Sequence, residues 1–169
     1  MCVKPDPRSH GFSLSSRGEQ PIIELRLAGR VSKIFSVERP IRFSHCDPAG
    51  IVYFAHFFDM FNAAVEDWFE QALGLSFEEM HMRRQVGFPV VNTQCEFLRV
   101  CRLGERLRIE FTVARLGHSS VELDIRGKVG GEERFRARHK IAMMSLATYR
   151  AVAIPEELRE KMQKFVAVA

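Results

Sequence analysis

One carboxylate stands out in this chain because of the residues around it. Asp47 lies in the turn sequence HCDPAG (45–50), directly before the apolar run IVYF and a long amphipathic segment. Backbone N–H groups at a helix start are unpaired, and the peptide dipoles place about half a positive charge there. Those donors, at Val52 to Phe54, would polarise a carbonyl oxygen while Asp47 attacks the carbonyl carbon or deprotonates a water. The alternative is that Asp47 only starts the turn or caps the helix.

Histidines near this turn allow a second chemistry. His45 and His56 flank it and could act as general acids, which would point to a dehydratase. A structural or solvent-facing role is the commoner one for both. His139 falls in an apolar register, where a hydrogen-bonded core or interface residue is expected. No Cys/His spacing predicts a zinc site, and no CxxC pair is formed by the four cysteines, Cys2, Cys46, Cys95 and Cys101.

The element that would position Asp47 is a helix. Apolar residues, many of them aromatic, recur at helical spacing from Phe54 to Leu73, and Gly74 is a typical helix stop. A short second helix is expected over residues 77–84. The segment PEELREKMQKFV (155–166) predicts a closing helix, with Pro155 at a suitable first-turn position.

Strands are predicted on both sides of this helix. KIFSVERPIRF (33–43) indicates a strand or strand pair interrupted by Pro40. After Gly87 the period changes to two, and Gly130-Gly131 predicts a hairpin turn. The residues IAMMSLA (141–147) are apolar on both faces, which favours a central strand or a subunit interface. The alternating segments are 91–97, 107–113, 121–126 and 135–141.

These elements have an economical solution, an α+β fold with a strongly curved, antiparallel five-stranded sheet around one long central helix. Such a sheet leaves an edge strand and an open face, which both favour dimerisation. Residues 1–30 are expected to form an N-terminal extension, flexible or docked on a neighbour, and the more apolar PIIELRLAGRV (21–31) could add a strand. Residues 31–169 would form the folded domain.

Composition limits the partners. The 169 residues, 46% hydrophobic and 27% charged, are typical of one globular domain. The net charge of +4 suits a polyanionic small molecule, whereas the scattered basic residues and the lack of a recognition motif argue against nucleic acid. No apolar run approaches the roughly 20 residues that span a bilayer. The N-terminus lacks the apolar core of a signal peptide, so a reduced cytoplasmic setting is predicted.

The motif around Asp47 resembles a family signature. HCDPAGIVYF followed by a Phe-rich helix is similar to the 4-hydroxybenzoyl-CoA thioesterase family of hotdog folds, over roughly residues 34–155 and most strongly over 43–64. The resemblance implies that Asp47 is catalytic and that the backbone N–H of Phe54 holds the thioester oxygen. Gly50 would allow close approach of backbone to ligand, and Tyr53 would shape the acyl pocket beside Val52.

The resemblance also implies a coenzyme A site. The phosphates of CoA suit the basic surplus of the chain. ARLGHSSVE (114–122) resembles the family turn that grips the nucleotide, and it offers Arg115, His118 and Ser119. YRAVAIP (149–155) resembles the segment whose arginine contacts the phosphates, which assigns that role to Arg150. The first segment has fewer basic residues than the family usually carries, so an acyl-carrier-protein substrate stays open.

We therefore predict a thioester hydrolase, an acyl-CoA thioesterase acting on an aromatic (4-hydroxybenzoyl-like) or short-chain acyl group. No metal or organic cofactor is expected, since CoA is part of the substrate. No membrane partner is expected either, and homodimers would pair into a homotetramer. Two alternatives remain: a hotdog-fold hydratase or dehydratase, and a non-catalytic acyl-CoA or acyl-carrier-protein binding module in which Asp47 caps the helix.

Overall fold

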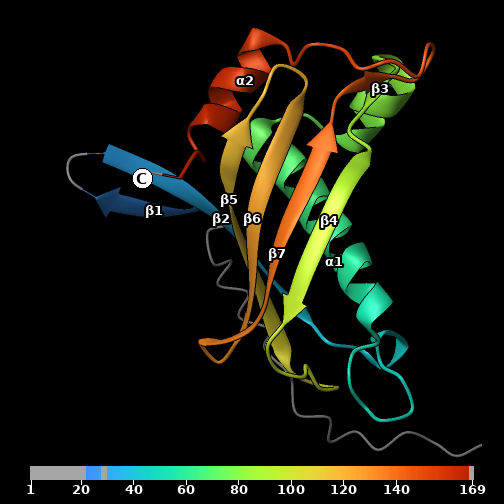
Figure 1. Cartoon of the computed structure of the whole chain (residues 1–169), viewed down its shortest axis with the longest axis vertical. Helices are drawn as coiled ribbons and strands as arrows, with labels where there is room; N and C mark the ends of the chain where they lie inside the picture. The colour runs from blue at the N-terminus through green and yellow to red at the C-terminus, as the bar shows by residue number, and fades with distance from the viewer. Residues whose placement is uncertain (1–21, 28–29, 168–169) are drawn as a thin grey trace, which may run out of the picture.

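A computed structural model describes residues 22–27 and 30–167. Most of the predicted extension, residues 1–21 and 28–29, lies outside the described residues. The main sheet is antiparallel, with strand order β1-β2-β5-β6-β7-β4 (Figure 1). Its strands are β1 (Ile22–Leu27), β2 (Arg30–Pro40), β4 (Val90–Phe97), β5 (Arg106–Leu116), β6 (Ser120–Val129) and β7 (Glu132–Ala142).

Smaller elements complete the fold. A two-stranded sheet joins β3 (Val86–Gly87) to β8 (Met144–Ser145). The helices are η1 (Phe43–His45), α1 (Phe54–Trp68), the π-helical turns η2 (Phe69–Leu73) and η3 (Glu79–Arg83), and α2 (Glu156–Gln163). The α+β class, the central helix and both shorter helices agree with the sequence prediction.

The prediction of five strands is wrong, because the main sheet has six. The additional strand is β1, which comes from the segment assigned to the extension. The long strand β2 serves two partners: residues 30–35 pair with β1 and residues 35–40 pair with β5. On the N-terminal side of Phe35, the C-terminal segment lies between β2 and β5 and takes the place of direct pairing. There Lys33 N–H donates to the Lys164 carbonyl, and Val113 N–H donates to the Phe165 carbonyl.

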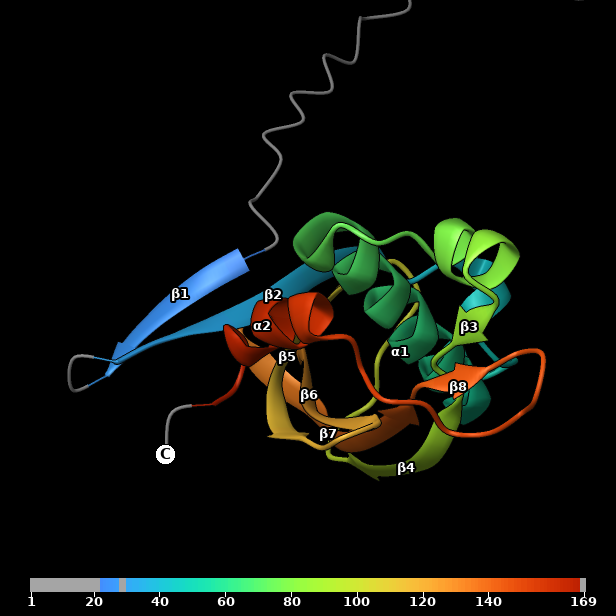
Figure 2. The ribbon, with the colours of Figure 1, turned by 90° about the horizontal axis from the view of Figure 1, so that it is seen from above.

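The helix α1 packs on the inner face of the curved sheet (Figure 2). Its ring contacts include Trp68 with Phe111 at 5.5 Å and Phe61 with Phe135 at 5.2 Å between centroids. Such pairs bury a large apolar area and fix the helix against the strands. The helical path runs on through η2 and ends at Gly74 in a left-handed conformation, as predicted. The buried residues of α1 are Phe57, Met60, Phe61, Ala64, Val65 and Trp68.

The outer face of the sheet carries alternating charges. Arg138 pairs with Asp124 at 3.0 Å and with Glu122 at 3.3 Å, and Lys128 pairs with Glu110 at 2.6 Å. This is the pattern of an antiparallel sheet with one dry and one wet face. In the described part of the chain, no helix is both long enough and apolar enough to cross a membrane.

Candidate functional site

Asp47 lies in a tight turn that its own side chain stabilises. Its Oδ1 accepts a hydrogen bond from the Ala49 N–H at 2.8 Å, and its backbone N–H donates to the Ile51 carbonyl at 2.9 Å. Gly50 adopts φ +74°, a left-handed conformation that suits glycine. The Asp47 side chain is half-buried, and among the described residues Oδ2 has no hydrogen-bond partner. The carboxylate therefore forms the turn with one oxygen and leaves the other free.

A neighbouring loop, residues 98–105, holds this turn in place. Val52 N–H donates to the Cys101 carbonyl at 2.9 Å, and Leu103 N–H donates to the Gly50 carbonyl at 3.1 Å. The loop is itself fixed by Arg134 on β7, which donates to the Val100 carbonyl at 3.1 Å and to Glu105 at 3.3 Å. A fixed turn allows the position of Asp47 relative to the helix start to be preorganised.

The structure narrows the predicted carbonyl donors to the start of α1. The Val52 N–H is occupied by Cys101, and the Tyr53 N–H donates to the His45 carbonyl at 3.0 Å. Phe54 is the first residue of α1, and among the described residues its N–H has no acceptor, as expected at a helix start. Tyr53 and Phe54 are exposed, with ring centroids 4.9 Å apart. Of the predicted donors, only Phe54 is free.

His45 and His56 line a separate cavity of about 400 Å³, which Asp47 does not line. The Nδ1 of His45 accepts from the Arg42 N–H at 3.1 Å, and the Nδ1 of His56 lies 3.4 Å from Asp59. Burial, aided by the charges of His56 and Arg42, lowers the pKa of His45. This arrangement agrees with structural or solvent-facing histidines better than with a dehydratase acid.

The predicted CoA residues divide into two places. Arg115 and His118 line a cavity of about 230 Å³ at the turn between β5 and β6, with Lys140 opposite them on β7. Ser119 is half-buried and its carbonyl accepts from the Met143 N–H at 2.7 Å. Arg150 is exposed on the loop after β8 and does not line this cavity.

Two basic residues at this turn were missed in the sequence. Lys140 lines the cavity, and Arg159 on α2 donates to the carbonyls of Gly117 and His118 at 2.8 and 2.9 Å. Lys140 lies within the predicted alternating segment 135–141. No signal in the sequence relates α2 to a turn 41 residues earlier, since that contact depends on the tertiary fold.

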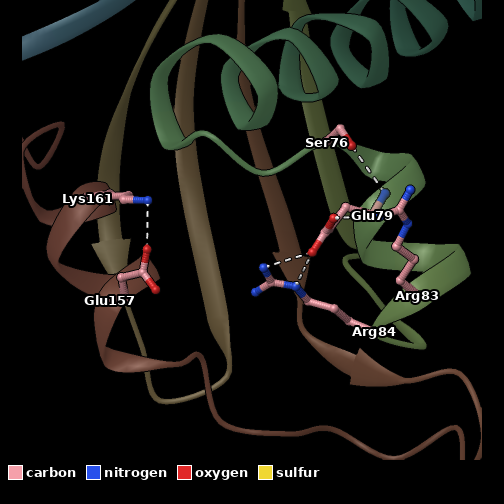
Figure 3. Close-up of polar contacts among 6 residues, drawn as sticks. All are labelled: Ser76, Glu79, Arg83, Arg84, Glu157 and Lys161. Carbon is pink, nitrogen blue, oxygen red and sulfur yellow. Dashed lines mark hydrogen bonds and ion pairs between the residues drawn. The ribbon is translucent and has the colours of Figure 1, made fainter.

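A further cavity, of about 220 Å³, lies beside η3 and α2. Figure 3 shows the polar contacts of its charged residues. The basic residues of the cavity are both paired: Arg84 donates to Glu79 at 3.1 Å, and Lys161 donates to Glu157 at 3.0 Å. The hydrogen bond from Lys161 lowers the pKa of Glu157. The charges around this cavity are balanced, so it does not suit a phosphate. The apolar part of its lining is Leu73, Leu75, Val86, Met143, Pro155 and Leu158.

Three further histidine and cysteine side chains are buried or half-buried, and they show no sign of catalytic activation. His139 is 2% exposed and hydrogen-bonded to Thr93, which confirms the prediction of a hydrogen-bonded core histidine. Burial raises the pKa of the Cys95 and Cys101 thiols to about 11, so neither is an activated nucleophile. Within residues 22–27 and 30–167, no group of three or more His, Cys, Asp or Glu side chains could hold a metal ion.

Comparison with known proteins gives a consistent picture. A model of the thioesterase-like superfamily matches residues 41–162, more than half of the chain. The 1,4-dihydroxy-2-naphthoyl-CoA hydrolase of Microcystis aeruginosa is 25% identical over 122 residues, which cover 72% of this chain and 88% of the relative.

Two solved structures support the fold. The 1,4-dihydroxy-2-naphthoyl-CoA thioesterase Slr0204 from Synechocystis is 21% identical, with a TM-score of 0.71 over 77% of this chain and 96% of that one. SAV2348 from Staphylococcus aureus, solved in complex with CoA, is 14% identical, with a TM-score of 0.73 over 82% and 89%. The hotdog fold is thus confirmed, whereas the narrower 4-hydroxybenzoyl-CoA branch stays a prediction. The names of the relatives agree with the predicted enzyme class, a thioester hydrolase, and the chain belongs to the thioesterase-like superfamily.

Proposed function

We propose that this protein hydrolyses the thioester of an aromatic acyl-CoA at the junction of the Asp47 turn and α1. The proposal depends on two groups at this junction that have no hydrogen-bond partner in the described part of the chain. An oxygen of Asp47 and the N–H of Phe54 are both without partners among the described residues, at the two ends of one short, braced turn. The bridge between Cys46 and Val52 places the residue before Asp47 beside the segment that leads into Phe54.

The chemistry needs only groups of this kind. The thioester oxygen accepts a hydrogen bond from the Phe54 N–H, which stabilises the negative charge that develops on it. Asp47 then forms a bond to the carbonyl carbon, the C–S bond breaks, and water hydrolyses the resulting mixed anhydride. In the other route Asp47 takes a proton from water, and the hydroxide adds to the carbon. In both routes the departing CoA thiolate takes up a proton, and no metal or organic cofactor is required.

The substrate class follows from the surroundings and the relatives. Aromatic side chains line the start of α1, with Phe57 and Phe97 rings 5.2 Å apart. Relatives are named for 1,4-dihydroxy-2-naphthoyl-CoA, and a structural neighbour binds CoA. We infer that Arg115, His118 and Lys140 hold the phosphates of CoA. Ser119 and Arg150, which the sequence motifs also assign to CoA, do not line this cavity. The acyl-carrier-protein alternative would use the same acyl site without this cavity.

Dimerisation forms part of the proposal. Strand β4 ends the sheet order, so one of its edges is unpaired in the described chain. Exposed apolar side chains gather on and after it, among them Val91 (58%) and Phe97 (45%). Unpaired apolar edges favour association with a second copy. We infer a homodimer through β4, with pairing into a homotetramer, in the cytoplasm.

Association can be measured by sedimentation. Val91→Lys should shift the mass toward the single chain, because an edge lysine opposes strand pairing. Thr148→Lys, on an exposed loop, is the control with the same added charge. A monomeric wild-type protein would contradict the dimer.

Asp47→Asn is the decisive variant for the chemistry. An asparagine can keep the turn, because its side-chain oxygen still accepts from the Ala49 N–H, but it cannot attack or act as a base. We expect the wild type to release thiol from at least one member of a panel of aryl-CoAs. In the Asp47→Asn variant, kcat should fall by about a thousandfold or more, with an unchanged unfolding midpoint. Equal turnover by the two proteins would leave Asp47 as a turn former only.

A further inference from the structure

The buried histidine His139 is a polar residue that the proposed mechanism does not use. It lies on the inner face of β7, 2% exposed, with its ring 6.3 Å from that of Phe61 on α1. Its Nδ1 is 2.9 Å from the Oγ1 of Thr93, the residue opposite it on β4. Its Nε2 is buried, and it has no hydrogen-bond partner among the described residues.

These contacts determine which nitrogen of His139 carries the proton. Burial lowers the pKa of His139, so the ring is neutral and holds a single proton on one nitrogen. An orphaned buried N–H is rarer than an under-satisfied acceptor. The proton therefore belongs on Nδ1, which donates to the Thr93 oxygen and leaves Nε2 as a bare lone pair. The Thr93 hydroxyl then keeps its own hydrogen free to donate to another group.

Thr93 lies on the side of β4 that faces α1. Thr93 is half-buried, on the inner face of the edge strand, and Phe97 on the same face contacts Phe57 of α1. Phe54 is the proposed donor to the carbonyl oxygen, and Phe61 lies beside His139. The two residues are seven positions apart, which corresponds to a rise of about 10 Å along the helix axis. An acyl group that starts at Phe54 and follows α1 brings its ring substituents toward this end of β4.

We propose that the Thr93 hydroxyl, oriented by His139, donates a hydrogen bond to a hydroxyl oxygen on the aromatic ring of the acyl group. Thr93 is then a specificity-determining residue and His139 a positioning residue. The inference rests on the proposed thioesterase function and deepens it. Aromatic walls select a flat apolar acyl group, whereas this hydroxyl distinguishes an oxygenated ring from a bare one.

The test compares two substrates that differ by one oxygen, 1,4-dihydroxy-2-naphthoyl-CoA and 1-hydroxy-2-naphthoyl-CoA. Thr93→Val should lower kcat/KM about tenfold for the first and less than about twofold for the second, because the hydrogen bond exists only with the first. Thr93→Ser keeps the hydroxyl and should keep the preference. Thr112→Val, on the outer face of β5, is the control. An equal effect of Thr93→Val on both substrates, or no effect, would overturn the proposal.

Binding and protonation can be measured without turnover. Calorimetry with the two free acids should show the same loss of preference in Thr93→Val, even in a protein that cleaves neither thioester. In that case the proposed function fails while this inference stands. The ¹⁵N resonances of His139 should report a proton on Nδ1 and a bare Nε2. A proton on Nε2 would mean that Thr93 donates to the histidine, which refutes the proposal.

Discussion

Gly127→Ala should destabilise the fold for a purely steric reason. Gly127 lies opposite Phe135 in the register of β6 and β7, and a Cβ at this position would lie 2.0 Å from the Phe135 ring. Carbon atoms in contact lie about 3.5 Å apart, so the ring must move by about 1.5 Å. It has no room, because Phe135 is fully buried and packs against Phe57 and Phe61 at 5.1 and 5.2 Å.

The expected cost follows from two opposing effects. Overpacking a core costs about 3 kcal/mol, while replacing a glycine within a strand returns about 0.5 to 1 kcal/mol of chain entropy. Gly127→Ala should therefore lower the free energy of unfolding by about 2 kcal/mol. Urea denaturation would show this as a lower midpoint with an unchanged slope.

A double-mutant cycle tests the stated cause. Phe135→Leu removes the ring that the new methyl group meets, so the double variant should be more stable than the sum of the single effects by about 1 kcal/mol or more. Additive losses would show that the methyl group clashes with something else. A loss below about 0.5 kcal/mol for Gly127→Ala alone would refute the packing argument.

Three further predictions concern pH, the nucleotide and the loop. Burial lowers the pKa of His139 below 6.5, so the unfolded chain binds the proton first and stability should fall as the pH drops below about 6.5. Urea midpoints across this range should fall less steeply in His139→Gln. Arg115→Ala should raise KM for an aryl-CoA but not for the same acyl group on N-acetylcysteamine, and equal changes would contradict a phosphate contact. Arg134→Gln should cost about 2 kcal/mol, measured by urea, and lower kcat, because Glu105 and the Val100 carbonyl lose a donor.

Much of the fold follows from periodicity. The helix after Asp47, its stop at Gly74 and the four alternating segments after Gly87 are all present near their predicted positions. The sequence left open that residues 21–31 add a strand, but the count of five did not include it. Residues 22–27 are few and have a partner only once β2 extends past the end of its pairing with β5. The local sequence does not indicate that the C-terminal segment lies beside β5 where β2 no longer pairs with it.

The site was predictable in type more than in detail. The turn at Asp-Pro-Ala-Gly and the start of the helix at Phe54 could both be predicted from the local sequence. That Val52 and Tyr53 have no free N–H depends on contacts with Cys101 and His45, and the first of these comes from a distant part of the chain. For the same reason, the partnership of Thr93 with His139 depends on strand register across 46 residues.

The two faces of the sheet and its edge have different surface chemistry, which bears on where the site is completed. The outer face has its charges paired, as at Arg138 with Asp124, so burying it would require desolvating ion pairs for little gain. Several exposed apolar side chains lie instead on β4 and the loop after it, where Phe97 contacts α1 and Cys101 braces the Asp47 turn. A second chain that covered this edge would bury apolar surface and exclude water beside the turn in one event. Association and catalysis should therefore depend on the same surface, and a variant that keeps full activity as a stable monomer would separate them.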